Sequence, residues 1–529
     1  MTRERRRIWP LVPILVGAVG LKVLLLVLNA VPFNSDEAVV ALMARHILRG
    51  ERPWFFYGQA YMGSLDAYLV AGAFRLLGER VLAIRLVQIV LFVGALWTGY
   101  EVVVRFTGDR RAAWLATVLM AFPPVLLTLY TTATLGGYGE ALLAGHLLLW
   151  WGHRLGYEDA QRWTLWLAWG LVGGFGFWAF GLVLVYLAPV GLWLLWRLRA
   201  RTWRGYLLAA VGFVMGSLPW WLGNLGRVDA GVAELFGSAI RSTVTAGSFL
   251  GDVGMRLFNA VVFGLPALFG LRFPWSVTGA PLWLAGPALA LYLGALGYGL
   301  RRRDREGAAL SGWLLLWSVA GALLLGFLLT PFGGDPSGRY FLPLYLPLFT
   351  FTAEALLVLW ERVGRWAGAL LGAVLAFNLV GTAQAALTNP PGITTQFEAI
   401  TQVDHRYDGA LIDFLRAHGG TRGYANYWVT FPIAFLSGEE ILLVPRLPYK
   451  ADLRYTSRDD RYAPYGEAVT ASPTVVYVTT NHPLLDALLR VRLRDLGVGY
   501  AEVQIGDYHV FYDLSRKVTP EELDLPLQE

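Results

Sequence analysis

Runs of about twenty apolar residues, separated by short polar segments, recur along the first 389 positions. An α-helix of this length spans the hydrocarbon core of a bilayer, because each residue adds about 1.5 Å of rise. Counting such runs predicts about eleven membrane-spanning helices, the first at 8–31, the third at 112–135 and the last at 366–387. We therefore expect a polytopic α-helical membrane protein.

The pattern changes near position 390, where the sequence Asn-Pro-Pro-Gly marks a break. Beyond it, helical periodicity alternates with short runs rich in β-branched residues. The helical stretches are 407–418 and 482–496, and the strand-like runs are 440–444, 474–479, 499–505 and 508–514. The chain is thus predicted to consist of a membrane domain at 1–389 and a small α/β domain at 390–529.

Charge gives the expected orientation. The net charge of +6 divides into +12 for residues 1–389 and −6 for residues 390–529, and arginines gather in every second short loop. Since basic loops stay in the cytoplasm, the N-terminus is predicted to be cytoplasmic and the C-terminal domain extracytoplasmic, in a plasma membrane. Two long loops, 32–80 and 226–280, are predicted on the extracytoplasmic side.

The amino-acid composition excludes several classes of protein and of functional site. Only 16% of the residues are charged and 56% are hydrophobic, whereas soluble domains carry about 25% charge. The chain has no cysteine, which excludes disulfides, thiolate metal sites and cysteine nucleophiles. We attribute the basic total to cytoplasmic loops, so no nucleic-acid partner is expected, and membrane lipids are the expected surroundings.

Two adjacent carboxylates, Asp36 and Glu37, follow the first span and open a helical stretch that reaches Arg49. Its apolar residues fall on one face, and Arg45 and Arg49 fall on the opposite, exposed face, which predicts a helix lying in the membrane interface. Asn34 and Glu37 have the spacing of a helix-capping box. The alternative is that a carboxylate at the membrane surface acts as a general base on a hydroxyl. The two interpretations are compatible.

Three further charged side chains are predicted on the same side of the membrane. Asp66 lies in a loop rich in glycine and tyrosine, and it either caps a helix, pairs with Arg75 or Arg52, or serves the site. Glu140 opens a later span, where an acid is costly unless it faces a cavity. Arg339 follows a glycine-rich turn and either binds a phosphate or pairs with Asp335.

These residues resemble the GT-C membrane glycosyltransferases, and specifically the glycosyltransferase family 39 type, which includes protein O-mannosyltransferases and bacterial transferases that add aminoarabinose to lipid A. The resemblance covers most of residues 1–390. It rests on the acidic pair after the first span, the loop at 58–63, the acid that opens a later span, and the segment Arg-Tyr-Phe-Leu-Pro at 339–343.

The resemblance implies transfer of a monosaccharide from a polyprenyl-phosphate carrier to an acceptor hydroxyl on the extracytoplasmic face, with inversion. The acceptor would be a lipid, a glycan or a protein. Asp36 would be the catalytic base and Glu37 its support. The implied substrate-binding residues are Glu140, Arg339, Tyr340, Arg52, Tyr61 and Asp66.

Some alternatives stay open at this stage. The aminoarabinose transferases carry a lysine and a proline where this chain has Ser64 and Leu65, so their phosphate clamp is not reproduced, and Arg52 is the suggested replacement. The carboxylates could hold Mg²⁺ or Mn²⁺, although no cofactor is required by the pattern. The rival functions are a polytopic transporter, a flippase or a polysaccharide polymerase, and a non-catalytic receptor or assembly scaffold whose C-terminal domain does the binding.

Overall fold

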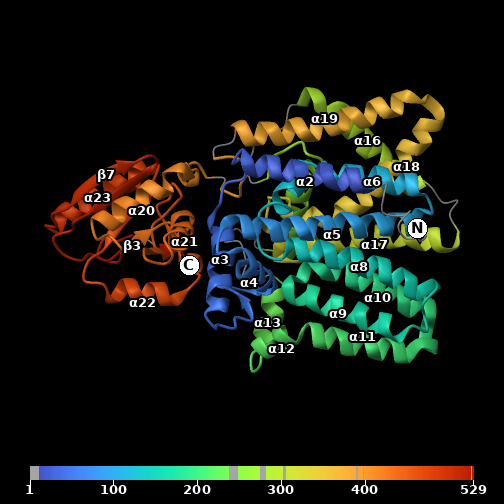
Figure 1. Ribbon diagram of the computed structural model, residues 1–529, viewed down its shortest axis with the longest axis horizontal. Coiled ribbons are helices and arrows are strands. Elements are labelled where there is room, and N and C mark those ends of the chain that lie inside the picture. Colours follow the sequence, from blue (N-terminus) through green and yellow to red (C-terminus); the bar gives the residue numbers. More distant parts are fainter. Residues whose placement is uncertain are drawn as a thin grey trace.

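A computed structural model describes residues 11–236, 248–274, 282–301, 306–388, 391–396, 398–525 and 527–528. It consists of a large helix bundle and a smaller C-terminal part with a β-sheet, which we call the tail (residues 391–528), at one end of the bundle (Figure 1). The helices of the bundle are α2 (Val12–Val27), α5 (Val81–Thr107), α6 (Arg110–Ala121), α7 (Val125–Tyr130), α8 (Tyr138–Tyr157), α9 (Trp163–Ala179), α10 (Leu184–Leu198), α11 (Trp203–Gly216), α12 (Leu218–Gly223), α13 (Val228–Leu235), α14 (Phe249–Phe258), α15 (Leu265–Leu268), α16 (Leu282–Arg301), α17 (Gly307–Leu329), α18 (Tyr345–Val363) and α19 (Arg365–Thr388).

Several of these helices are long and apolar enough to cross a membrane, which confirms a multi-pass membrane protein. Within the described ranges six helical runs meet this condition on length and composition. They are Val81–Thr107, Gly181–Leu198, Phe249–Leu268, Gly307–Leu329, Arg339–Val363 and Arg365–Thr388.

Two segments of the bundle differ from the sequence-based expectation. The span expected at 112–135 is broken into α6 and α7 at Pro123 and Pro124, because proline lacks the N–H that a continuous helix needs. The loop expected at 226–280 contains the apolar helical run Phe249–Leu268. Its charged residues Asp252 and Arg256 lie 3.8 Å apart as an ion pair one helical turn apart, which reduces the cost of placing them there.

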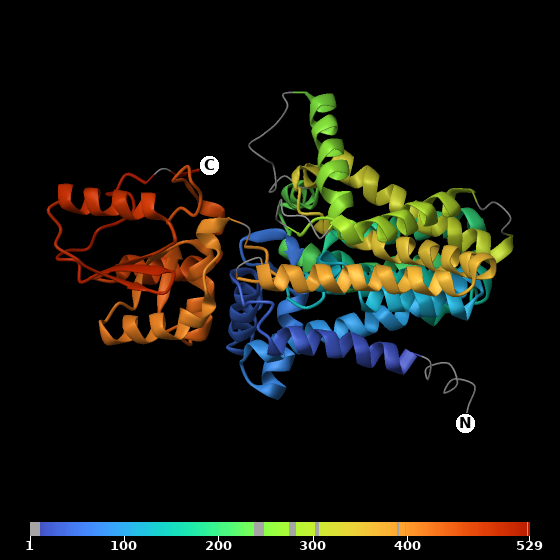
Figure 2. The ribbon, with the colours of Figure 1, turned by 90° about the horizontal axis from the view of Figure 1, so that it is seen from above.

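The segment between the first two spans lies across the end of the bundle that faces the tail (Figures 1 and 2). It contains α3 (Ser35–Leu48), a two-stranded hairpin of β1 (Phe55–Phe56) and β2 (Gln59–Gly63), and α4 (Leu65–Leu77). Twelve of the 14 residues of α3 are buried. The tail covers the face of α3 that the sequence predicted to be exposed, so this helix is enclosed between the tail and the bundle.

The tail is built on a five-stranded sheet with the order β4-β3-β6-β8-β7. Strand β3 is parallel to β4 and β6, whereas β8 is antiparallel to β6 and β7. The predicted α/β character is therefore confirmed. The strands of the tail are β3 (Arg422–Ala425), β4 (Leu442–Pro445), β5 (Tyr455–Thr456), β6 (Val476–Thr480), β7 (Ala501–Ile505), β8 (Tyr508–Tyr512) and β9 (Leu527–Gln528), and its helices are α20 (Asp408–Ala417), α21 (Tyr427–Leu436), α22 (Ala463–Ala471) and α23 (Pro483–Asp495).

Alternate residues of each strand enter separate cores on the two faces of the sheet, as the period of two requires. Tyr424 packs with the leucines of α23, while its neighbour Ala425 packs with residues of α20 and α21. Helix α21 was not anticipated from the sequence. It lies on the side of the sheet that meets the bundle, and its residues Tyr427 and Phe431 belong to the core of the bundle.

Candidate functional site

Helix α3 places the two adjacent carboxylates. The Asn34 side chain accepts the N–H of Glu37 at 3.2 Å, so the predicted N-cap is confirmed. Successive residues on a helix point about 100° apart. Asp36 consequently faces the junction with the tail, whereas Glu37 points into the bundle.

Glu37 is buried in an ion pair. Its carboxylate lies 2.5 Å from Arg85 of α5 and accepts the backbone N–H of Thr134 at 3.1 Å. Burial raises the pKa of Glu37 to about 7, against the lowering effects of the Arg85 charge and the Thr134 hydrogen bond. The structure therefore places Glu37 behind the site, where it fixes the first turn of α3 to the bundle.

Asp36 faces a small polar cavity of about 70 Å³. Its Oδ1 accepts the hydroxyl of Tyr427 at 2.7 Å, and its Oδ2 accepts the hydroxyl of Thr395 at 3.1 Å. Both donors come from the tail. The side chains that line the cavity are Asp36, Phe56, Gln59, Tyr61, Met62, Tyr130, Leu135, Tyr138, Arg339 and Thr395.

Arg339 forms the opposite pole of the polar cavity. It follows Gly338, whose φ of +85° favours glycine, and it opens a 3₁₀ helix that leads into α18. Its guanidinium lies 2.6 Å from Asp335 and donates to the hydroxyl of Tyr340 at 3.3 Å. The sequence left two alternatives for Arg339, binding a phosphate and pairing with Asp335. The structure shows the pair with Asp335, and Arg339 also lines the cavity.

An apolar groove of about 250 Å³ adjoins the polar cavity. Residues of α10 and α17 form its walls, together with Phe332 and Tyr340. Tyr61 of strand β2 lines both the groove and the cavity. The site is thus divided into an apolar and a polar compartment that meet at this tyrosine.

The other two predicted acids form a pair beside the site. Asp66 accepts hydrogen bonds from Gln88, at 3.3 Å, and from the hydroxyl of Thr134, and the carboxyl of Glu140 lies against it. Burial raises the pKa of Asp66. Two buried carboxyls in contact share a proton because both cannot ionise together. The expected pairing of Asp66 with an arginine is therefore not found in the described structure.

Arg52 lies outside both compartments. Its guanidinium donates to the backbone carbonyls of Ile47, at 3.2 Å, and Glu51, at 2.7 Å, and the residue is exposed. The suggestion that Arg52 replaces a missing phosphate clamp is thus not supported by its position. Among the predicted residues, Asp36, Tyr61 and Arg339 come together in the polar cavity, and Tyr340 reaches the groove.

The tail contributes residues that the sequence did not single out. Besides Tyr427 and Thr395, Arg461 lies 5.3 Å from the centre of the Tyr427 ring and donates to the carbonyl of Gly58 at 3.3 Å. Arg85 was also missed, although an arginine inside an apolar run is itself a signal of a buried partner.

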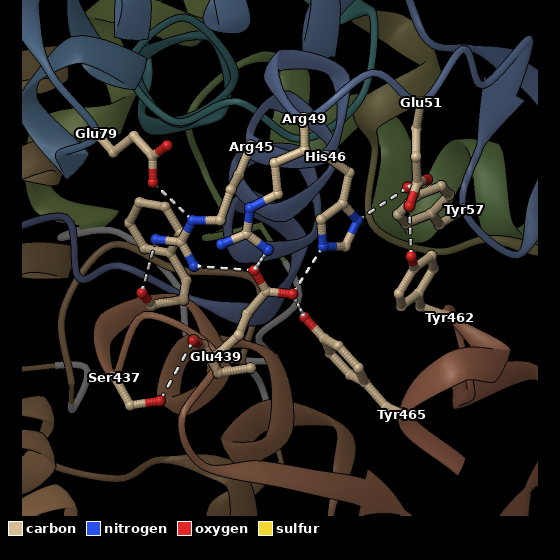
Figure 3. Close-up of polar contacts among 12 residues, drawn as sticks. Arg45, His46, Arg49, Glu51, Tyr57, Glu79, Ser437, Glu439, Tyr462 and Tyr465 are labelled. Atoms are coloured by element: carbon tan, nitrogen blue, oxygen red, sulfur yellow. Dashed lines mark hydrogen bonds and ion pairs between the residues drawn. The ribbon is translucent and has the colours of Figure 1, made fainter. Parts of the chain in front are cut away.

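A polar cluster holds the tail on the far end of α3 (Figure 3). Glu439 contacts His46 at 2.7 Å, Arg49 at 2.5 Å and the hydroxyl of Tyr465 at 2.9 Å. Burial opposes ionisation of Glu439, but the hydrogen bonds from His46 and Tyr465 and the nearby charges lower its pKa to about 2. Glu51 accepts the hydroxyls of Tyr57 and Tyr462, both at 2.6 Å, beside this cluster.

A divalent cation was an open alternative. Within the described part of the chain, no three or more His, Asp or Glu side chains gather as a ligand set. Asp36 is the only carboxylate among the side chains that line the polar cavity as described. The described residues around the cavity therefore do not form the ligand set of a resident cation.

The bundle, the helix across its end and the appended tail together form the GT-C fold, which the sequence resemblance implied. Crystal structures of ArnT from Cupriavidus metallidurans match the chain with a TM-score of 0.56 at 14% identity, in a form bound to undecaprenyl phosphate and in the apo state. The match to the undecaprenyl phosphate complex covers 96% of this chain and 99% of the ArnT chain. The match to the apo structure covers 94% of this chain and 98% of the ArnT chain.

The archaeal oligosaccharyltransferase AglB from Archaeoglobus fulgidus, in complex with an inhibitory peptide and a dolichol-phosphate, has a TM-score of 0.49 at 15% identity over 97% of this chain and 74% of that chain. No protein-family model matches the sequence, and no curated protein matches it either. At 14% identity, the likeness to the ArnT structures shows a shared fold.

Proposed function

We propose that the protein is a membrane glycosyltransferase that moves a monosaccharide from a polyprenyl-phosphate carrier to an acceptor hydroxyl. The observation that carries this proposal is the junction at Tyr61, where an apolar groove meets a polar cavity with a carboxylate and an arginine. A polyprenyl phosphate has the same division, an apolar chain ending in a phosphate. ArnT, which has this fold, was crystallised with undecaprenyl phosphate.

In this proposal the acceptor hydroxyl loses its proton to the carboxylate of Asp36 as its oxygen attacks the anomeric carbon. The bond from that carbon to the carrier phosphate breaks, and the phosphate leaves with the bonding electrons. Attack from the opposite face inverts the configuration. Arg339 and Tyr340 stabilise the departing phosphate by charge and hydrogen bonding.

The remaining predicted residues take supporting roles. Glu37, through Arg85, holds the first turn of α3 so that Asp36 keeps its direction. Asp66 and Glu140, which do not line the described cavity, support the sugar and acceptor site from behind its wall. Residues 1–389 form the catalytic membrane domain with a cytoplasmic N-terminus. Residues 390–529 form an extracytoplasmic domain, in agreement with the contact between the tail and the long loop 32–80.

The test is transfer by the purified protein in lipid nanodiscs, offered a panel of polyprenyl-phosphate sugars with membrane extract as acceptor. We expect the carrier to lose its sugar, and Asp36→Asn to lower turnover by about 10²- to 10⁴-fold. Binding of undecaprenyl phosphate should survive Asp36→Asn and weaken in Arg339→Gln. Parallel assays with EDTA decide whether a cation is needed.

Normal turnover in Asp36→Asn would contradict the assigned base. Absence of transfer from every donor, with sugar or lipid instead crossing the bilayer of sealed vesicles, would replace the proposal by a transporter or flippase.

A further inference from the structure

The tail makes direct contact with the carboxylate of Asp36. Tyr427 lies on α21, 391 positions further along the chain, and donates to Oδ1 at 2.7 Å. Thr395 lies where the tail leaves the bundle and donates to Oδ2 at 3.1 Å. Each carboxylate oxygen is therefore held by one hydroxyl from the tail, and Asp36 also lines the polar cavity.

The hydrogen-bond directions are fixed by the neighbouring residues. The Asn34 amide accepts the N–H of Glu37 through Oδ1, so its Nδ2 is the atom that faces Thr395, at 3.1 Å. The Thr395 hydroxyl accepts from this amide and must direct its own proton to Asp36. The phenol of Tyr427 likewise has a proton to donate.

The backbone of Tyr427 is also tied to α3. The Ser35 hydroxyl donates to the Tyr427 carbonyl at 2.5 Å, and the side chain of Tyr427 is 4% exposed. Three consecutive residues, Asn34, Ser35 and Asp36, thus bond to the same two residues of the tail. These contacts fix the positions of Tyr427 and Thr395 relative to the first turn of α3.

The far end of the same helix is held independently. Glu439 of the tail contacts His46 and Arg49 (Figure 3). By sequence position on α3, these contacts lie about three helical turns from Asp36. Because both ends of α3 are attached, the tail cannot rotate about either contact alone. The hydroxyls of Tyr427 and Thr395 are consequently kept against Asp36 by the docking of the tail.

The adjacent acids Glu37 and Asp36 have partners of different chemistry. Glu37 is paired with a cation, Arg85, which suits a structural carboxylate. Asp36 accepts hydrogen bonds from two neutral hydroxyls, which orient a carboxylate. A base that must accept a proton needs orientation of this kind.

From this geometry we propose that the tail completes the catalytic site, with Tyr427 and Thr395 acting as positioning residues that aim the Asp36 carboxylate at the acceptor hydroxyl. This inference rests on the proposed function and assigns part of the site to the tail. The groups that face Asp36 and Tyr427 from the surrounding elements include Tyr61, Arg461, Tyr449 and Asp459.

The experiment compares the full-length protein with Tyr427→Phe and Thr395→Val, in nanodiscs, with the donor that the wild type uses. Each loses one hydrogen bond to a charged group, so we expect kcat to fall about tenfold or more. The acceptor KM and the affinity for undecaprenyl phosphate should stay within about twofold. Tyr477→Phe is the matched control, because its hydroxyl donates to the Val518 carbonyl at the same 2.7 Å, inside the tail.

A double-mutant cycle separates positioning from a merely structural role. In Asp36→Glu, whose longer side chain already disturbs the arrangement, adding Tyr427→Phe should cost less than about twofold further. An equal loss in both backgrounds would overturn the inference, and so would a fall in Tyr477→Phe as large as in Tyr427→Phe. If Asp36→Glu is inactive, the split between kcat and lipid affinity in Thr395→Val decides instead.

Two outcomes distinguish this inference from the proposed function. Normal or raised turnover in Tyr427→Phe and Thr395→Val, with Asp36→Asn inactive, would refute positioning by the tail and leave the transferase intact. Normal turnover in Asp36→Asn would remove the base itself.

Discussion

The two sides of helix α3 use ion pairs in different ways. On the bundle side, Glu37 and Arg85 form a pair in which neither side chain is more than 2% exposed. On the tail side, Glu439 is 12% exposed and is shared among His46, Arg45 and Arg49, the last of which is 57% exposed. The first pair is enclosed in protein, whereas the second cluster is partly in contact with water.

This difference determines what each group contributes. A buried pair costs much desolvation energy, and removing one partner leaves an uncompensated charge. A partly exposed cluster costs less to break because water solvates the released groups. The bundle side therefore secures α3 as part of the fold, and the tail side adjusts how firmly the tail docks.

Breaking the buried pair should have the largest effect. Arg85→Met leaves the Glu37 carboxyl without its cation, and we expect a loss of about 3–5 kcal/mol in the free energy of unfolding. Thermal unfolding in detergent micelles measures it. The double variant Arg85→Met with Glu37→Gln should regain much of the loss, since no charge then remains. Wild-type stability in Arg85→Met alone would contradict this account.

The two acids should also respond oppositely to pH. The pKa of Glu37 in the folded protein is about 7, above the ordinary 4.5, so the folded state binds the proton more tightly. The contribution of Glu37 to the free energy of unfolding is full below about pH 4.5. This contribution, up to about 3 kcal/mol, is lost as the pH rises through 7. The pKa of Glu439 is about 2, so its contribution is present above pH 4.5 and is lost as the pH falls toward 2.

Unfolding of the bundle and hydrogen exchange in the tail, followed from pH 2 to pH 8, test this contrast. Glu37→Gln should flatten the change between pH 5 and pH 7 in the bundle and leave the tail unchanged. The prediction would be wrong if the wild-type bundle became more stable as the pH rose from 5 to 7 and Glu37→Gln abolished that rise.

Loosening the tail should have an intermediate effect. Glu439→Gln keeps the shape of the side chain but weakens its hydrogen bonds to His46 and Tyr465, so we expect about tenfold faster hydrogen exchange in the last turn of α3. Glu440→Gln is the matched control, because Glu440 is exposed and pairs with Arg416 inside the tail. Equal exchange in the two variants would mean that Glu439 does not hold the tail.

Local patterns in the sequence were sufficient to predict much of the bundle and one half of the site. Apolar runs identify the spans, and the spacing of Asn34 and Glu37 identifies the cap at the start of α3. Counting spans places Asp36 and Arg339 on the same side of the membrane. These inferences succeed because they depend on segments of about twenty residues or on the parity of crossings.

The other half of the site depends on contacts between distant segments. Tyr427 and Thr395 meet Asp36 across more than 350 positions, and no periodicity in the sequence encodes such a meeting. The sequence also did not predict that the Glu37 side chain points into the bundle. Helix geometry gives the angle between the side chains of Asp36 and Glu37, but it does not say which of them faces the bundle. Arg45 was expected on an exposed face for the same reason, since the tail that covers it is far away in sequence.

The smallest expected effect comes from the most exposed member of the tail cluster. Arg49 reaches Glu439 at 2.5 Å but is 57% exposed, so water replaces much of what the pair provides. Arg49→Ala should change the docking of the tail by less than about 1 kcal/mol, and the change should shrink further in 1 M salt, where charges are screened beyond about 3 Å. Hydrogen exchange at low and high salt measures both. A loss as large as that of Glu439→Gln would mean that this arginine, rather than buried His46, provides the main contact for Glu439, and the contrast between enclosed and exposed pairs would then fail on the tail side of α3.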